Sequence, residues 1–501
     1  MRETREGDDM AMTKDERLAA VHEEALQEFD RIQSALQHER SICLEDRRFY
    51  SIAGAQWEGP LGDQFENKPR FEFNKVHLSV IRIINEWRNN RITVDFIPKD
   101  GSTNLELADT CDGLYRADEQ DSGAQEAYDN AFEEAVGGGF GAWRLRAEYE
   151  DDDDDENERQ RICIEPIFDA DSSVFFDLDA KRQDKADAKR CFVLASYTPE
   201  AFEAEFGHNP TDWPKAVQQR EFDWSTPEVV YVAEYYRVEE VPETIHVFRG
   251  LDGEEMRVPG QQLKDDEDKL DELLATGFRL VRQKRVKRRR VHKYILSGAQ
   301  VEEDCGLIAG RCIPVIPVYG KRWFVDNIER CMGHVRLAKD AQRLMNSLLS
   351  WLTEIAARFD TEKPILTPEQ VNGHAAMWAQ DNVKRFPYLL LNQIRDGNGD
   401  PVAGTAQPLA YTKAPNVPPA MAALIQIASQ ALDDLLGNQQ AGEQLQPNQS
   451  GKAVELVQNR LDMQVFIYMS NMAKAMKRCG EVWLSMAKDV LIEDERKMKM
   501  V

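Results

Sequence analysis

The stretch Asn438-Gln-Gln-Ala-Gly-Glu-Gln-Leu-Gln-Pro-Asn-Gln449 separates two helical patterns near the end of the sequence. It holds one aliphatic residue beyond alanine and no positive charge, so it cannot bury a core of its own. Residues 416–437 before it open with prolines and read as a helix that Gly437 would cap. From Ser450 a third helical pattern runs for about 40 residues. The sequence therefore predicts a polar loop held between two helices.

A first long helix is expected farther upstream, over Asn327–Arg358. Its apolar residues recur at spacings of three and four and form one stripe: Ile328, Met332, Val335, Ala338, Ala341, Met345, Leu348, Leu352 and Ile355. The prolines of Lys363-Pro-Ile-Leu-Thr-Pro end this pattern. The stripe predicts packing against neighbours on one side of the helix.

Residues 359–415 read as a small α/β insert between the first two helices. We expect a short helix over 369–380 and strand-like runs over 385–391 and 406–411, which the turn signal Asp396-Gly-Asn-Gly-Asp separates. The resulting order is helix, insert, helix, polar loop and long helix. Common soluble enzyme folds do not need this order, whereas a ring that lines a hole does.

The preceding residues, 1–326, read as an α+β body with large mixed or antiparallel sheets. Helices are expected over 14–50, 74–90, 105–120, 124–136 and around 261–275. Strands are expected over 92–98, 143–149, 162–168, 174–177, 192–197, 229–238 and 244–248. The acidic run Asp151–Glu156 would be the solvated tip of a hairpin.

Composition limits the class of protein. The chain has 501 residues, 42% of them apolar, which is enough for sizeable cores and about three domains. It shows no apolar run of about 20 residues and no charged-then-apolar leader, so neither a membrane span nor a secretory signal is expected. Eight cysteines are scattered without a Cys-x-x-Cys pair, which favours reduced, structural thiols.

The net charge of −26 bears on nucleic-acid binding. A protein that grips the DNA backbone usually presents positive charge, because each phosphate contact is electrostatic. This chain should not bind DNA tightly as a monomer. The charge argues against a repressor or a nuclease and suits a conduit whose acidic wall repels phosphate.

Motifs for catalysis or cofactors do not fit their contexts. Gly137-Gly-Gly-Phe-Gly-Ala142 matches a dinucleotide fingerprint but follows a helix and precedes a strand, which favours a tight helix-to-strand turn. Ser450-Gly-Lys-Ala lacks the upstream glycine and the hydroxyl residue of a Walker loop. A metal-dependent nuclease would need carboxylates that converge from separate strands. We expect no catalytic residue, no metal and no cofactor.

The basic segment 282–293 is the sharpest local charge feature, with Arg285, Lys287, Arg288, Arg289 and Arg290 close together. One interpretation is a surface that touches nucleic acid or an acidic neighbouring subunit. The other is a solvent-facing edge strand that charge protects from unwanted pairing. Both interpretations stay open at this point.

Five strings, in this order, resemble the portal protein family of short-tailed, P22-like double-stranded DNA phages. They are Gly141-Ala-Trp-Arg-Leu with its acidic sequel, Arg285-Val-Lys-Arg-Arg-Arg-Val-His-Lys, Leu307-Ile-Ala-Gly with Ile313-Pro-Val-Ile-Pro-Val-Tyr-Gly, Val335-Arg-Leu-Ala-Lys-Asp-Ala-Gln-Arg-Leu, and Ala406-Gln-Pro-Leu-Ala-Tyr. The resemblance covers about residues 40 to 490.

The resemblance implies a homododecameric ring at one capsid vertex, assembled in the host cytoplasm and carried in the virion. Terminase would drive double-stranded DNA in through the ring, and the genome would leave by the same channel. Further partners would be a tail adaptor and the major capsid and scaffolding proteins, with no membrane.

The resemblance also assigns parts to segments. Residues 1–326 would form the wing, 327–358 and 416–437 the stem helices, 359–415 the clip, 438–449 the tunnel loop, and 450–501 the helix toward wing and crown. The expected channel residues are Gln439, Gln440, Glu443, Gln444, Gln446 and Asn448. The expected clip surface for terminase and adaptor is Glu369, Gln380, Asp381, Lys384 and Arg385.

A different function stays open beside this one: a capsid scaffold or tail adaptor ring that does not conduct DNA. It predicts a ring without a through-channel, or no ring. Portals of this type often continue beyond the equivalent of Val501 into a crown and a helical barrel, so either this member lacks a barrel or the sequence is shortened.

Overall fold

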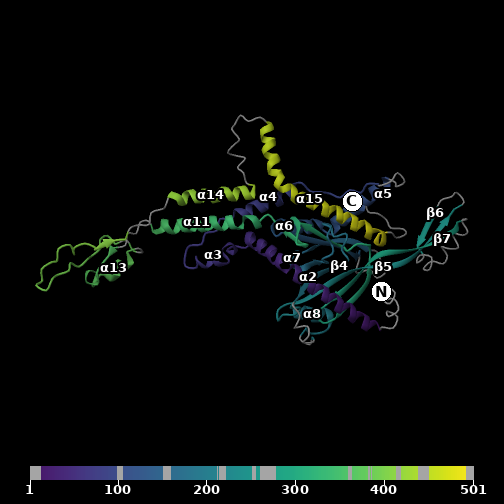
Figure 1. Ribbon diagram of the computed structural model, residues 1–501, viewed down its shortest axis with the longest axis horizontal. Coiled ribbons are helices and arrows are strands. Elements are labelled where there is room, and N and C mark those ends of the chain that lie inside the picture. Colours follow the sequence, from purple (N-terminus) through teal and green to yellow (C-terminus); the bar gives the residue numbers. More distant parts are fainter. Residues whose placement is uncertain are drawn as a thin grey trace. The chain divides into compact units, whose positions relative to one another are not determined.

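The computed structural model describes residues 13–98, 105–150, 160–210, 213, 222–250, 255–259, 278–358, 364–381, 384, 386–412, 419–437 and 451–491. The chain is α+β and divides into two compact units (Figure 1). The first comprises 1–51, 76–337 and 440–501, and the second comprises 52–75 and 338–439.

Two antiparallel sheets form the centre of the first unit. The three-stranded sheet has the order β2-β1-β9, with β1 at Phe140–Tyr149, β2 at Gln160–Ile167 and β9 at Val315–Tyr319. The larger sheet has the order β3-β4-β5-β7-β8, and β6 pairs with β5. Its strands are β3 Val174–Phe176, β4 Arg190–Tyr197, β5 Val230–Arg249, β6 Glu255–Pro259, β7 Arg279–Leu296 and β8 Val301–Ile308.

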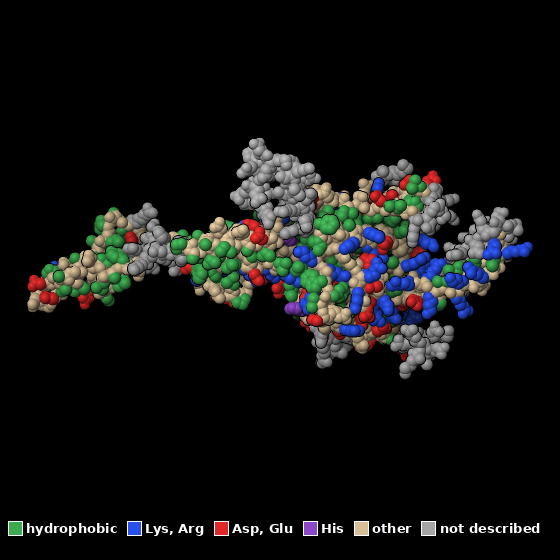
Figure 2. Space-filling model, turned by 45° about the horizontal axis from the view of Figure 1, so that its top comes forward, with side chains coloured by type: hydrophobic (Ala, Val, Ile, Leu, Met, Phe, Trp, Pro, Cys, Tyr) green, Lys and Arg blue, Asp and Glu red, His purple; other side chains and the backbone are tan. Residues whose placement is uncertain are grey.

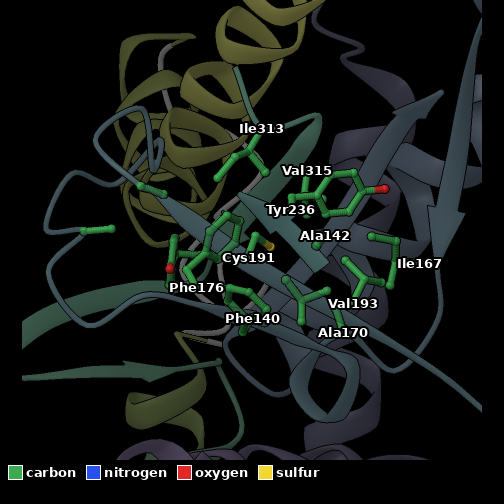
Figure 3. Packing of buried hydrophobic residues seen from close by; sticks show 14 of the residues in the cluster. Phe140, Ala142, Ile167, Ala170, Phe176, Cys191, Val193, Tyr236, Ile313 and Val315 are labelled. Carbon is green, nitrogen blue, oxygen red and sulfur yellow. The ribbon is translucent and has the colours of Figure 1, made fainter. Parts of the chain in front are cut away.

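Strand alternation gives each sheet two buried faces. Cys191 and Val193 of β4 pack with Phe140 and Ala142 of β1 in one core between the sheets (Figure 3). Phe192, between those two β4 residues, belongs to a second core on the opposite face. Because side chains alternate along a strand, a sheet covered on both sides reads as a continuous apolar run.

Helix α2 (Lys14–Ser51) covers that opposite face of the larger sheet. Its residues Leu26, Phe29 and Ile32 are fully buried, and the Phe29 ring meets the Phe192 ring edge-on at 5.4 Å. The predicted helix over 14–50 is confirmed, because its apolar residues at helical spacing meet a flat apolar sheet.

Helices α5 (Leu105–Asp121), α6 (Ala124–Gly137) and α15 (Gly451–Val490) pack on the three-stranded sheet. Trp143 of β1 lies on the face opposite Ala142, where its ring meets Tyr128 of α6 at 5.1 Å. Gly141 lies on the same face as Trp143. A Cβ atom at Gly141 would stand 2.1 Å from the carbonyl oxygen of Ala131 in α6. This glycine lets α6 approach the strand closely.

Other expectations for this unit are confirmed. Helix α4 (Lys75–Asn89) covers the expected 74–90, and α6 turns directly into β1 as the glycine run predicts. Strands β1 and β2 form the expected hairpin, whose acidic tip 151–156 lies outside the described residues, as does the helix expected around 261–275. The runs 229–238 and 244–248 are one strand, β5. Pro242 is tolerated there because, among the described strands, only β7 pairs at that position.

The helix expected from Asn327 is wrong in its first third. Ile328–Met332 is strand β11, which pairs with β10 (Lys321–Val325), and helix α11 begins only at Lys339 after the 3₁₀ turn η4 (Arg336–Ala338). Asp326 and Asn327 both have positive φ, 53° and 62°, as a two-residue hairpin turn requires. The apolar spacing hid this turn, because Ile328 and Met332 fit either period.

The strand expected over 92–98 is also wrong, since these residues carry no strand pairing. The Phe96 N–H donates instead to the side chain of Asp112 on α5, at 2.7 Å. Val94 packs against Gly480. A Cβ atom added at Gly480 would stand 2.6 Å from the Cγ1 atom of Val94. The single interior glycine of the long helix α15 therefore makes room for this extended segment.

The second unit pairs helix α11 (Lys339–Arg358) with helix α14 (Pro419–Leu436). The segment 52–75 carries the short turns η1 (Ala55–Trp57) and α3 (Pro60–Asp63). The insert holds β12 (Pro364–Ile365), α12 (Pro368–Val371), α13 (Ala375–Gln380) and β13 (Ala410–Tyr411). Gly437 follows α14 with φ 65°, the left-handed cap that the sequence predicts.

Two expectations for the insert are corrected. The helix expected over 369–380 is interrupted at Gly373, whose φ is 79°. The run 385–391 forms no strand in its described part. The Trp378 indole N–H donates to the Leu390 carbonyl at 2.8 Å, and the Asn392 N–H to the Gln370 carbonyl at 2.9 Å, so bonds to the two short helices replace a strand ladder.

Candidate channel and docking surfaces

The ends of two helices bracket the predicted channel loop. Helix α14 ends at Leu436, and α15 begins at Gly451. Gln439, Gln440, Glu443, Gln444, Gln446 and Asn448 lie outside the described residues. The helices before and after this segment lie where the sequence predicts them.

A tight polar and aromatic cluster anchors α15 in the first unit. The Trp483 indole N–H donates to Asp118 of α5 at 2.7 Å, and the Trp143 indole N–H to the Cys479 sulfur at 3.4 Å. Tyr115 also donates to this sulfur, at 3.5 Å. Burial raises the pKa of the Cys479 thiol to about 11, so it stays neutral near neutral pH. The helix that follows the loop is thus fixed at its C-terminal half.

Helix α11 carries a row of buried polar side chains that the apolar pattern did not reveal. Gln342, Asn346 and Ser350, four residues apart, accept hydrogen bonds from the N–H groups of Lys75, Phe73 and Phe71 at 3.2, 3.1 and 3.0 Å. Two residues of the extended chain at 71–75 rise about 6.6 Å, and four residues of helix α11 rise about 6 Å. Every second N–H of the chain therefore meets every fourth side chain of the helix. A run of polar residues with period four beside the apolar stripe was the available signal.

The apolar sides of α11 and α14 form a small core with the buried residues Leu348, Met421 and Ala428, against which Leu352, Ile355 and Ile425 pack. At one end, the Lys75 ammonium group donates to Ser429 at 2.9 Å and to Asp433 at 3.2 Å. Apolar packing therefore holds the two helices together, and a partly buried ion pair joins α14 to Lys75.

Both helices also expose apolar side chains away from this core. On α14, Leu424, Ile427 and Leu435 lie on one face, and Ile427 is 62% exposed. On α11, Leu344 and Trp351 are exposed one heptad apart. An apolar face without a partner in a single chain is typical of a surface that another protein covers.

The insert is built around a glutamine rather than an apolar core. Gln370 is 1% exposed, and its amide group donates to the carbonyls of Thr405 and Gln407 at 3.0 and 3.1 Å. Its side-chain oxygen accepts from the Thr367 N–H at 3.1 Å. In the described residues of 364–412, no apolar side chain is buried.

The predicted clip residues Glu369, Gln380, Asp381 and Lys384 are exposed on this insert, and Arg385 lies outside the described residues. The clip residues expected from the sequence are all charged or polar. The insert also exposes apolar residues that were not expected there: Ile365, Tyr388, Leu389, Leu390, Val402, Leu409 and Tyr411. Their density in an insert without an apolar core was visible in the sequence as the signal Tyr388-Leu-Leu-Leu. The insert thus exposes both charged and apolar side chains.

The basic segment lies on β7 where that strand pairs with β5 alone among the described strands. Lys and Arg side chains gather along this ribbon (Figure 2). Arg285, Lys287 and Arg289 are exposed and alternate, so they share one face, opposite Thr244, Pro242 and Glu240. Arg288 and Arg290 lie on the other face, where Arg290 pairs with Asp489 of α15 at 2.7 Å. Among the described strands, Arg282–Arg290 pair with β5 alone, as an edge would, whereas 291–296 pair with both β5 and β8.

The described residues hold no group of three or more histidine, cysteine or acidic residues arranged to bind a metal ion. None of the helices in this part of the chain is long and apolar enough to cross a membrane.

Comparison with known proteins identifies the family. The family model described as "Phage P22-like portal protein" matches residues 26–501. The curated "Portal protein" of Acyrthosiphon pisum secondary endosymbiont phage 1 is 40% identical over 489 residues, which are 96% of this chain and 67% of that protein. This match extends across both compact units, so the chain belongs to the P22-like family of phage portal proteins.

Proposed function

We propose that this protein forms a ring at one capsid vertex and conducts double-stranded DNA during packaging and ejection. Portal proteins of this family are structural rather than catalytic, and the family implies self-assembly, capsid partners and a place in the virion. The observation that carries the proposal is that helix α14 ends at Leu436 and α15 begins at Gly451, so the glutamine- and asparagine-rich residues 438–449 come between two helices in the sequence.

In this proposal the loop 438–449 contacts DNA in the channel. Its amide side chains form weak hydrogen bonds, and the lack of positive charge leaves no strong phosphate site. The net charge of −26 also repels the phosphates of DNA. Weak contact permits sliding, because no single position of the DNA is strongly favoured.

The proposal assigns the other parts to assembly and docking. Residues 1–326 together with strand β11 would be the wing, 339–358 and 416–437 the stem helices, 359–415 the clip, and 450–501 the helix toward wing and crown. The exposed apolar faces of α11 and α14 would pack against neighbouring copies in a twelve-membered ring. Because each copy carries −26, this packing must overcome mutual repulsion. The clip, with Glu369, Gln380, Asp381, Lys384 and Arg385, would meet terminase and then the tail adaptor.

The first test is the assembly state by cryo-electron microscopy and mass measurement. The proposal expects closed rings near twelve times the 57.4-kDa chain mass, pierced by a channel wide enough for duplex DNA. A closed oligomer without a channel would instead favour a scaffold or a tail adaptor.

The second test removes the loop. Deletion of Gln439–Gln449 should leave ring formation intact and reduce packaged DNA or its retention, measured as DNA length per particle. Mass measurement of the deletion variant is the control that its rings still form. Packaging and retention equal to wild type in the loop deletion would contradict the channel role.

We propose in addition that Arg285, Lys287 and Arg289, with Arg288 and Arg290 beside them, contact a polyanion. The candidates are nucleic acid and an acidic surface of a neighbouring copy. The triple alanine variant of the exposed face should lower duplex DNA binding by rings and flatten its salt dependence if DNA is the partner. If the partner is a second copy, ring formation falls instead. Alanine at Arg282 and Lys284, on the other face, is the control.

A further inference from the structure

Two cysteines far apart in the sequence lie in contact inside the first unit. The Cys43 sulfur of α2 is 3.8 Å from the Cys331 sulfur of β11, across 288 positions of the chain. The two residues are 0% and 5% exposed and belong to the core between the sheets. All eight cysteines lie within the described residues and are free thiols. No other two of their sulfurs are hydrogen-bonded to each other.

One guanidinium group holds both cysteine segments. Arg336 donates to the Cys43 sulfur at 3.4 Å and to the Cys331 carbonyl at 2.9 Å. Its Nε–H donates to Asp46, one turn after Cys43 on α2, at 2.7 Å. The positive charge lies beside one sulfur, and the hydrogen bonds fix both backbones, so the sulfurs are held in register.

The two thiols differ in acidity. The hydrogen bond with Cys331 lowers the pKa of Cys43, and the charges of Arg40 and Arg336 lower it further against the effect of burial. The same hydrogen bond and burial raise the pKa of Cys331 well above its usual value. Cys43 is therefore the nucleophile of the pair, because the thiolate is the reactive form.

We propose that Cys43 and Cys331 are a redox modification site. When a peroxide oxidises them, the two cysteines form a disulfide with each other, and a reductant can reverse it. The Cys43 thiolate attacks one peroxide oxygen, which breaks the O–O bond and gives a sulfenic acid and hydroxide. The Cys331 thiol then attacks the Cys43 sulfur, its proton leaves with the displaced hydroxide as water, and the S–S bond forms. In total, two thiols lose two electrons and two protons, and one peroxide becomes two waters.

Bond formation requires the sulfurs to approach from 3.8 Å to about 2 Å. The disulfide would tie α2 to β11, the strand that ends five positions before Leu337, where the segment 76–337 of the first unit ends. A particle assembled in a reducing cytoplasm and then released would carry the thiols first and the disulfide later. That order of events rests on the proposed function, whereas bond formation does not.

The test treats the purified protein with hydrogen peroxide, then denatures it, alkylates free thiols and maps peptides without reduction. We expect a Cys43–Cys331 linked peptide that dithiothreitol removes, and a thermal midpoint that rises by about 3 °C on oxidation. In Cys331→Ser, which lacks the second thiol, dimedone should label Cys43 as a sulfenic acid. Cys191→Ser, a buried cysteine of the same core, is the control and should keep the linked peptide.

One result would overturn the proposal. This is recovery of Cys43 and Cys331 as free thiols at a peroxide dose that oxidises the partly exposed Cys111, Cys305 and Cys312. Wild-type protein decides this point alone, so the proposal stays testable even if a serine variant does not fold. A channel-less oligomer would refute the proposed function and leave this result unaffected.

Discussion

The Asn346 side chain accepts a hydrogen bond from the Phe73 N–H at 3.1 Å, although 273 positions separate the two residues. Its amide group donates to Gln56 at 2.6 Å, and its oxygen also accepts from Gln342 at 3.0 Å. One buried asparagine thus connects helix α11 to two parts of the segment 52–75. This segment joins the second unit through polar bonds, which explains why apolar periodicity placed it with the body.

Asn346→Ala should lower the free energy of unfolding by about 2 kcal/mol, because it leaves the Phe73 N–H and the Gln56 side chain without this partner. Urea unfolding measures the change. Ser347→Ala is the control: its hydroxyl donates only to Leu344 of its own helix, at 2.9 Å, so little change is expected. Equal losses in both variants would contradict the special role of Asn346.

Lys75→Met should cost about 1 kcal/mol through the lost contacts to Ser429 and Asp433, since the pair is about one-third exposed and solvent screens it. A double-mutant cycle with Asp433→Asn measures the coupling between the two charges. Asp434→Asn, its exposed neighbour on α14, should show no coupling to Lys75. A coupling of zero for Asp433 as well would show that the contact adds nothing.

Ile427→Glu should prevent or weaken ring assembly while each chain stays folded. The side chain is 62% exposed in one chain, so a charge there costs little until another copy covers it. Mass photometry and circular dichroism check the two statements. Gln426→Glu adds the same charge at an exposed position of the same helix and should leave assembly unchanged. Normal rings from Ile427→Glu would show that this face is not an interface.

The free energy of unfolding of the first unit should depend on pH through Glu134, a buried residue that is 3% exposed. Burial raises the pKa of this carboxyl from 4.5 to about 7, although Arg47 and the N–H groups of Asp169 and Ala170 favour its charged form. Between pH 4.5 and 7 the folded chain then binds more protons than the unfolded chain. Stability therefore falls as pH rises through this window, by about 3 kcal/mol for this group at most.

Glu134→Gln should remove this fall, because nothing at the position then titrates. Unfolding by urea at a series of pH values measures the slope in both proteins. Glu133→Gln changes the exposed neighbour on α6 and should keep the wild-type slope. A slope that is the same in all three proteins would contradict the assignment to Glu134.

Local patterns determined much of this fold. Helices α2, α4, α5, α6, α14 and α15 follow from apolar spacing and cap residues, and β1 and β2 follow from alternation around an acidic turn. These signals act between residues close in sequence, so one sequence is enough to read them. The collinear strings also led to the family, which the comparisons confirm.

Only the tertiary structure decided the rest, because the deciding contacts join distant residues. Ile328–Met332 became a strand since Lys321–Val325 pairs with it, and 92–98 stayed unpaired since Asp112 takes the Phe96 N–H. The row of Gln342, Asn346 and Ser350 gained its meaning from the chain at 71–75. The contact of Cys43 with Cys331 has no local signature at all, because hydrogen bonds and packing over 288 positions create it.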